Sequence, residues 1–234
     1  MKLSDKILLG FLAVVVAAAL AVVFALRAAG TTTAGTSPAL QRFATDSLAY
    51  RGEAFSRIRA QGGGWKLRIA RADSHAVTIT REDETRHKVR VTAEEGTLAL
   101  KSSSMALAHE TIVADIATPR LRSLSIHGAV DVAVSGFTED SLRFTSAGGS
   151  QTVMRNCTIG RLTLNLGGFS DVKAKECRIS EAELNTSGAY GVVLSLEDGK
   201  LRGRAEGMGG IEIYGSVAEN TLETAGLVDV SYHD

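Results

Sequence analysis

The sequence has little net charge, little proline and little cysteine, and each shortage excludes a class of protein. Its 26 basic and 26 acidic side chains cancel, which argues against a nucleic-acid-binding protein because such proteins carry an excess of basic charge. Two prolines and 24 glycines without a triplet period exclude a collagen-like chain and are typical of an all-β protein with many turns. No cysteine follows closely after the apolar N-terminal run, so a lipoprotein anchor is not indicated.

Motifs of known catalytic or phosphate-binding sites are also missing. The patterns G-x-S-x-G and H-E-x-x-H and the phosphate-binding loop do not occur. The aromatic side chains Phe169, Tyr190 and Tyr214 are dispersed, and core packing explains them as well as sugar stacking does. The histidines are scattered without a visible partner: His75, His87, His109, His127 and His233. We therefore expect a protein that is not an enzyme and that has no cofactor and no metal site.

The N-terminus contains an apolar run, from Ile7 to Leu26, without a charged residue. Its 20 residues would span about 30 Å as a helix, which matches the hydrocarbon core of a bilayer. We expect a transmembrane helix over residues 7–27 after a cytoplasmic tail of residues 1–6, in which Lys2 and Lys6 set the orientation. The alternative is a cleaved signal peptide, whose apolar region is usually shorter.

Beyond the apolar run, residues 28–49 are small and polar and are predicted to form a linker. A single domain is predicted over residues 50–234, where apolar and polar residues alternate with the period of two that is typical of strands. This alternation places a set of side chains on the inward face of the strands: Trp65, Leu67, Ile69, Val77, Ile79, Val89, Val91, Leu98 and Leu100.

Glycine recurs at nearly constant intervals through the second half of this domain. The spacings are 20, 20, 20, 19 and 19 residues, and a β-branched residue follows each glycine four places later: Gly128, Gly148, Gly168, Gly188, Gly207 and Gly226. Glycine adopts positive φ at a bend and lets neighbouring backbones lie close together. The repeats, from about residue 119 to 234, predict an all-β fold: a parallel β-helix, or solenoid, with coils of about 20 residues after one N-terminal transmembrane helix.

The two cysteines, Cys157 and Cys177, are one repeat apart. In the predicted solenoid they stack on neighbouring coils with Cα atoms about 5 Å apart, a separation at which disulfides form. Two hypotheses stay open, a disulfide in an oxidising compartment and a pair of buried thiols that fill the core. Neither makes the pair a catalytic or metal site, because no other ligand accompanies it.

Two further polar positions repeat with the same spacing. Asn165 and Asn185 each precede a repeat glycine by three residues, and stacked asparagines hydrogen-bond as a ladder; a polar binding groove is the functional alternative. Asp131, Asp171 and Asp229 also share a position, but Asp131 and Asp171 would lie two coils, or about 10 Å, apart, which is too far for one calcium ion. We expect these carboxylates to serve turns.

Three segments follow one another in a recognisable order: AFSRIRAQGGGWKLRIARADSHAVTITREDE, KVRVTAEEGTLALKS and IVADIATPRLRSLSIHGAVDVAV. The first opens with an F-x-x-I step at residues 55–58, and the third holds a P-x-L-x-x-L step at Pro119, Leu121 and Leu124. From about Glu53 to Asp234 the chain resembles the putative auto-transporter adhesin, head GIN domain family. The coils GGSQT and GMGGI depart from its pattern. The resemblance implies a β-helix on the bacterial cell envelope with an adhesive role, and it carries over no catalytic residues.

Together these features predict a single-pass protein of the bacterial inner membrane, with its N-terminus in the cytoplasm and its C-terminal domain periplasmic or extracellular. The expected function is binding or adhesion. The expected partners are an envelope protein or a glycan, and the membrane itself through residues 7–27, with no nucleic acid. The alternatives are a self-assembling envelope scaffold joined through the ends of the solenoid and a glycan-acting β-helix enzyme.

Overall fold

The computed structural model describes residues 41–42, 47–50, 53–81, 89–103 and 111–233. The predicted cytoplasmic tail, transmembrane helix 7–27 and most of the linker lie outside these residues. In the described part, no helix is long and apolar enough to cross a membrane. The chain divides into two compact units, Met1–Ala39 and Leu40–Asp234, and every described residue belongs to the second.

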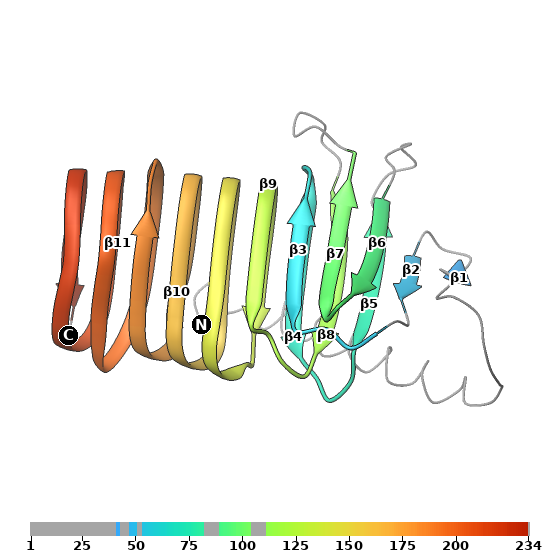
Figure 1. Cartoon of the computed structure of the whole chain (residues 1–234), viewed down its shortest axis with the longest axis horizontal. Helices are drawn as coiled ribbons and strands as arrows, with labels where there is room; N and C mark the ends of the chain where they lie inside the picture. The colour runs from blue at the N-terminus through green and yellow to red at the C-terminus, as the bar shows by residue number, and fades with distance from the viewer. Residues whose placement is uncertain (1–40, 43–46, 51–52, 82–88, 104–110, 234) are drawn as a thin grey trace, which may run out of the picture. The chain divides into compact units, whose positions relative to one another are not determined.

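All regular elements in the described part are strands, and they form one sheet. Their bounds are β1 (Gln41–Arg42), β2 (Ser47–Tyr50), β3 (Arg57–Gln61), β4 (Trp65–Arg71), β5 (Ala76–Arg81), β6 (Val89–Glu94), β7 (Thr97–Ser102), β8 (Ile112–Thr118), β9 (Ser123–Ser135), β10 (Thr138–Thr186) and β11 (Ala189–His233). A straight strand of 49 residues would extend about 160 Å. Strand β10 instead bends repeatedly, and Figure 1 shows its successive lengths, which we call passes, side by side.

The prediction of a parallel β-helix is wrong, because the sheet is mixed and curled (Figure 1). Four strand pairs of the described part are antiparallel: β1–β2, β2–β5, β5–β8 and β6–β7. All four lie before residue 119, outside the glycine repeats. The alternation of apolar and polar residues identified β4 to β7 as strands, but this pattern does not encode the direction in which strands pair. The all-β class itself agrees with the structure.

The N-terminal half, from β1 to β8, is built around two central strands. Strands β3 and β4 each lie between two parallel neighbours, β7 and β9 for β3, and β8 and β9 for β4. Antiparallel strands then cover the outer side, because β6 pairs with β7 and β5 pairs with β8. The turn between β6 and β7 has positive φ at Glu95 and Gly96, which is typical of a tight hairpin.

In the repeat half, from β9 to β11, each pass pairs in parallel with the pass 19 or 20 residues earlier. Leu124 lies opposite Phe144 between β9 and β10, and Val172 lies opposite Val192 between β10 and β11. Because the offset equals the repeat, equivalent side chains of successive passes stack in rows. The repeat half therefore presents long rows of like positions on its surface.

The core runs through both halves and is filled by the inward rows. The predicted inward side chains of β4, β5 and β7 are buried, among them Trp65 at 2% exposure and Leu98 and Leu100 at 0%. Val89 is an exception, since it is only half-buried at the start of β6.

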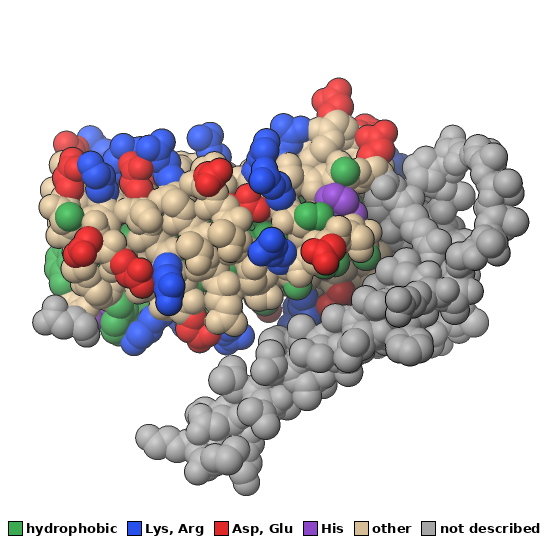
Figure 2. All heavy atoms as spheres, turned by 90° about the horizontal axis from the view of Figure 1, so that it is seen from below, with side chains coloured by type: hydrophobic (Ala, Val, Ile, Leu, Met, Phe, Trp, Pro, Cys, Tyr) green, Lys and Arg blue, Asp and Glu red, His purple; other side chains and the backbone are tan. Residues whose placement is uncertain are grey.

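The last pass of β11, residues 215–233, differs from the others. Its apolar side chains pack against the core but stay half-buried: Val217, Leu222, Val228 and Val230. In the described part no strand covers the outer side of this pass, and Figure 2 shows hydrophobic side chains among charged ones at this end of the unit.

Candidate binding groove

A row of glycines marks the bend of every pass in the repeat half. All six repeat glycines have positive φ. At Gly168, where φ is +81°, an added Cβ atom would lie 2.6 Å from the backbone oxygen of Gly148 in the pass below. Only glycine satisfies both conditions, because side chains disfavour this φ and no real Cβ contact is that short. The glycine row therefore fixes where each pass turns and how closely the passes stack.

Three of the six repeat glycines are followed directly by a large apolar side chain that is exposed: Phe169 is 68% exposed, Met208 is 60% exposed and Leu227 is 73% exposed. Phe169 lies opposite Ala189 in the next pass, and Met208 follows Gly207, which stacks on Gly188. The row thus places Phe169 and Met208 on either side of a small residue.

A groove of about 990 Å³ runs beside this row, across the passes of β4, β9, β10 and β11. Part of its lining consists of small residues that leave space, Ala129, Gly149 and Ala189. The lining also includes two exposed apolar side chains, Phe169 and Met208. At Gly149 an added Cβ would meet no atom within 4 Å. The groove is thus an open channel on the surface with an apolar side.

Polar side chains line the groove next to the apolar row. Lys66 of β4 is in register with Asp131 of β9, which is in register with Gln151 of β10. Asp171 follows in the same row and forms an ion pair with Lys173, with Nζ and Oδ2 3.2 Å apart. The prediction that Asp131 and Asp171 serve turns is wrong, because both lie within strands and line the groove.

Beneath the groove the structure is closely packed. Ser146, Ser150 and Ser170 are buried and form a triangle of hydrogen bonds with Oγ–Oγ distances of 2.7, 3.3 and 3.1 Å. The Tyr190 ring lies so close to Gly209 that an added Cβ there would be 2.6 Å from a ring carbon. Such packing indicates a groove that is formed before any ligand binds.

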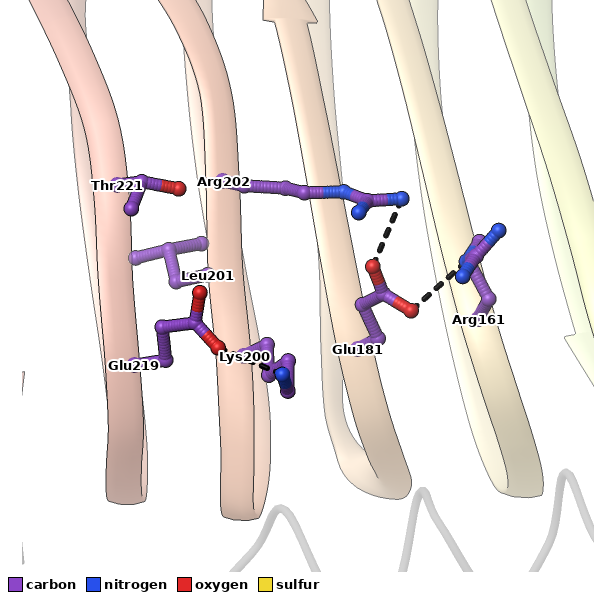
Figure 3. A pocket seen from close by; sticks show the side chains of 7 residues that line it. All are labelled: Arg161, Glu181, Lys200, Leu201, Arg202, Glu219 and Thr221. Carbon is purple, nitrogen blue, oxygen red and sulfur yellow. Dashed lines mark hydrogen bonds and ion pairs between the residues drawn. The ribbon is translucent and has the colours of Figure 1, made fainter.

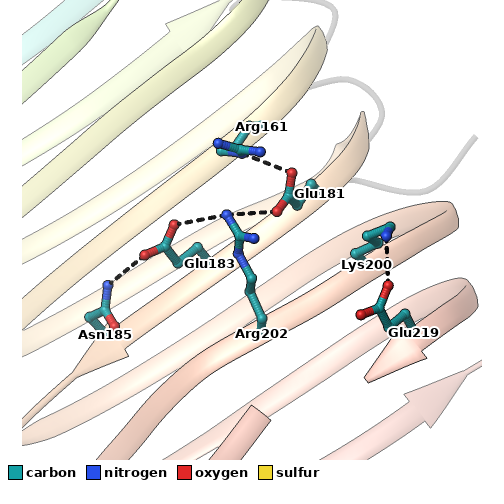
Figure 4. Close-up of polar contacts among 7 residues, drawn as sticks. All are labelled: Arg161, Glu181, Glu183, Asn185, Lys200, Arg202 and Glu219. Atoms are coloured by element: carbon teal, nitrogen blue, oxygen red, sulfur yellow. Dashed lines mark hydrogen bonds and ion pairs between the residues drawn. The ribbon is translucent and has the colours of Figure 1, made fainter. Parts of the chain in front are cut away.

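A second, smaller cavity of about 200 Å³ lies on another face of β10 and β11 (Figure 3). Its charged side chains neutralise one another. Glu181 accepts from Arg161 at 2.8 Å and from Arg202 at 2.7 Å, and Lys200 lies 2.6 Å from Glu219. Figure 4 shows this network extending from Arg202 to Glu183. No charged group lining this cavity in the described part is left without a partner, so it forms a less suitable ligand site than the groove.

The cysteine pair lies in the core of β10, away from the groove. Cys157 and Cys177 are both free and buried thiols. The hydrogen bond with Cys177 lowers the pKa of Cys157 to about 7, against the effect of burial, and the same contact raises the pKa of Cys177. Neither thiol lines the groove.

The predicted asparagine ladder is confirmed, since Asn185 Nδ2 donates to Asn165 Oδ1 at 3.2 Å. This contact continues the ion-pair network of Figure 4 rather than the groove. The described histidines stay apart: His75 contacts Phe55, His127 lies near Ser125 and His233 stacks on Tyr214. His87 and His109 lie outside the described residues. Within the described part, no group of three His, Cys, Asp or Glu side chains could hold a metal ion.

Sequence reasoning missed one member of the glycine row and one exposed side chain of the groove. Gly62 is an earlier member of the glycine row, because an added Cβ on Gly128 would meet the Gly62 carbonyl. The 66-residue gap between them, which holds β4 to β8, hides it from a search at period 20. Phe169 is exposed rather than packed in the core; the signal was its place directly after a repeat glycine, which Met208 shares.

The chain has the same kind of fold as a crystal structure of a putative adhesin from Bacteroides fragilis, which matches with a TM-score of 0.59 and 17% identity, over 80% of this chain and 95% of that chain. A putative adhesin from Parabacteroides merdae matches with a TM-score of 0.42 and 11% identity, over 80% and 95% of the two chains. A putative lipid binding protein from Parabacteroides distasonis matches with a TM-score of 0.44 and 12% identity, over the same shares.

Among curated proteins, none matches this chain. Residues 54–217 match the family described as putative auto-transporter adhesin, head GIN domain. This range covers more than half of the chain and includes the groove from Lys66 to Met208. It confirms the resemblance found in the order of the sequence segments, and the chain belongs to the putative auto-transporter adhesin, head GIN domain family.

Proposed function

We propose that this protein is a binding module of the bacterial cell envelope and that its groove takes an extended polypeptide segment of an envelope partner. The observation that carries the proposal is the exposure of Phe169 and Met208 beside the groove, at 68% and 60%. Large apolar side chains that stand together in water mark interaction sites, and aromatic and methionine side chains are enriched at the centres of protein interfaces.

The shape of the groove supports a polypeptide as the ligand. It crosses several parallel passes and has an apolar row beside a polar row, Lys66, Asp131, Gln151 and Asp171. An extended peptide alternates its side chains between two sides with a period of two residues. Apolar side chains of such a segment would contact Phe169 and Met208, while polar groups would face the carboxylates.

The location is proposed on separate grounds. Membership of an adhesin family favours the cell envelope, and the apolar run of residues 7–26 favours a single-pass anchor that leaves the domain outside the cytoplasm. Anchoring would confine the groove to one surface of the membrane, as an adhesive role requires.

The experiment compares two variants of the purified full-length chain in detergent. The double variant Phe169→Ser/Met208→Ser removes the apolar side of the groove, and Leu227→Ser removes an equally exposed side chain that occupies the same repeat position but does not line the groove. Binding to solubilised envelope proteins and to isolated envelope glycans is measured separately. We expect the double variant to bind envelope protein about tenfold more weakly or worse, and Leu227→Ser to bind like the wild type.

Each other outcome contradicts the proposal in a defined way. Equal binding by both variants would exclude the groove. If the chain binds only glycan, and this binding depends on Phe169 and Met208, the ligand of the groove is a glycan and not a polypeptide. Capture of only the chain itself would favour the self-assembling scaffold, which sedimentation of the full-length chain at rising concentration tests independently.

A further inference from the structure

The last pass of β11 ends the sheet with an edge that no strand of the described part covers. An uncovered edge presents a row of unpaired backbone N–H and C=O groups. Along this edge the segment Glu219–Glu223 has Leu222 half-buried on its inward side. The Leu222 N–H already donates to Asn220 Oδ1 at 3.1 Å, so a further strand would pair the other backbone groups of this edge and complete the burial of Leu222.

The passes below show how charged side chains are arranged when a carboxylate has neighbours on both sides. Glu181 lies between Arg161 of the preceding pass and Arg202 of the following one, with N–O distances of 2.8 and 2.7 Å (Figure 3). Glu176 and Glu197 each pair with one basic side chain of the preceding pass, Arg155 at 3.6 Å and Arg178 at 3.4 Å. Carboxylates of the repeat half therefore can pair with basic side chains of an adjacent pass, and Glu181 does so on both sides.

The carboxylates of the last pass have basic neighbours in the preceding pass only, whereas Glu181 has them on both sides. Glu219 pairs with Lys200, and Glu223 lies 3.9 Å from Arg204, both basic groups belonging to the pass below. In the sequence, residues 205–234 contain no Lys or Arg but six acidic residues: Glu206, Glu212, Glu219, Glu223, Asp229 and Asp234. The remaining chain, residues 1–204, holds all 26 basic residues and the other 20 acidic ones. On their outer side, Glu219 and Glu223 have no cation within the described part.

We propose that this edge accepts an extended strand of a partner protein that carries two basic side chains four residues apart, with aliphatic side chains between them. The basic side chains pair with Glu219 and Glu223, as Arg202 pairs with Glu181, and the aliphatic ones cover Leu222. Backbone hydrogen bonds along the edge supply the rest of the contact. The edge and the groove are separate surfaces, so this inference does not depend on the proposed ligand of the groove.

A second copy of the chain fits the edge less well than a basic strand. Several described strands carry two or more basic side chains on one face: β3 with Arg57 and Arg59, β4 with Lys66 and Arg68, β10 with Lys173 and Lys175, and β11 with Lys200, Arg202 and Arg204. None of these segments is an edge of the sheet, because β3 and β4 are paired on both sides and the segments of β10 and β11 lie between neighbouring passes. The edge strand β6 has Arg90, but Glu94 follows four residues later. If Arg90 paired with one carboxylate of the last pass, Glu94 would lie opposite the other. Two copies that met through their last passes would bring like charges together.

The probe is a synthetic peptide, Val-Lys-Val-Thr-Val-Lys-Val, with blocked ends, added to the purified full-length chain in detergent. Two peptides serve as controls: one replaces both lysines by glutamate, and the other replaces the two central valines by proline, which keeps the charge but removes backbone donors. Binding is measured by titration, and the site is located by hydrogen exchange of the backbone amides.

We expect the lysine peptide to bind and to slow amide exchange in residues 217–224. The double variant Glu219→Gln/Glu223→Gln should weaken this binding about five- to tenfold. The matched control Glu197→Gln/Glu206→Gln, which removes two ion-paired carboxylates of the preceding pass, should leave it unchanged. The glutamate and proline peptides should not bind measurably.

Three results would overturn the proposal. Equal binding by the proline peptide would show charge attraction without strand pairing. Binding without slower exchange at residues 217–224, or no binding at all, would exclude the edge as the site. Slow exchange there that rises with protein concentration in the absence of peptide would identify a second copy as the occupant.

Discussion

The two ends of the described sheet differ in how far their apolar side chains are buried. In the N-terminal half, antiparallel β5 and β6 cover β8 and β7, and even β6 buries Val91 and Ala93. In the last pass of β11, no side chain of residues 214–233 is buried. Both β6 and the last pass are edge strands with a partner on one side in the described part, yet only β6 buries apolar side chains.

The largest expected effect comes from the glycine row, which distinguishes the two halves most sharply. Gly168→Ala should lower the free energy of unfolding by about 3–4 kcal/mol, because it combines an unfavourable φ with a Cβ atom 2.6 Å from the Gly148 oxygen. Gly96→Ala, in the β6–β7 turn, should cost only about 1–2 kcal/mol, since its nearest neighbour is the flexible end of Arg57 at 3.6 Å. Urea unfolding of both variants provides the measurement. Equal losses would mean that close stacking of the passes contributes nothing.

A smaller effect is expected from matched leucine truncations at the two ends. Leu100→Ala in β7 removes a side chain that is 0% exposed and should cost about 3 kcal/mol. Leu222→Ala in the last pass removes a half-buried side chain and should cost about 1 kcal/mol. Thermal and urea unfolding measure both. A cost at Leu222 as large as that at Leu100 would show that the last pass is covered in solution.

The smallest effects should come from exposed ion pairs. The hydrogen bond from Lys200 lowers the pKa of Glu219, and the same contact raises the pKa of Lys200. The contribution of Glu219 is therefore lost as the pH falls through its lowered pKa, and that of Lys200 is lost as the pH rises through its raised pKa. Since both side chains are more than half exposed, Glu219→Gln should leave stability at pH 7 unchanged.

Asp115→Asn, at the partly shielded pair with Arg68 in the N-terminal half, should cost less than about 1 kcal/mol. Urea unfolding at pH 7 measures the cost of both substitutions. A loss in Glu219→Gln larger than that in Asp115→Asn would contradict this ranking.

The sequence predicted the features that depend on local pattern. The strands of the N-terminal half followed from alternation around Trp65 and Leu98, and the order of three segments identified the family. The direction of pairing was not predictable, because the same alternating residues suit parallel and antiparallel neighbours. The strands between Gly62 and Gly128 interrupt the 20-residue period of the glycines. The regular glycines after Gly128 therefore predicted a parallel β-helix, and the antiparallel pairs before residue 119 show that this prediction is wrong.

The candidate groove was less predictable than the strands. Its rows form only when passes 19 or 20 residues apart lie in register, which brings Phe169 and Met208 to one side. In the sequence these two residues are 39 apart, and nothing local shows that they are exposed. Their shared position after a repeat glycine was the one available signal, and it becomes meaningful only when the side-chain direction at the bend is known.

The most direct test of the groove as a binding site is photo-crosslinking in cells from position 151, with the full-length chain. Two variants fill open space with a leucine side chain: Gly149→Leu inside the groove and Gly210→Leu outside it, both at positions where an added Cβ meets no atom within 4 Å. We expect a discrete crosslink to an envelope polypeptide that Gly149→Leu abolishes and Gly210→Leu preserves. A crosslink that survives Gly149→Leu, or that Gly210→Leu removes equally, would contradict binding in the groove.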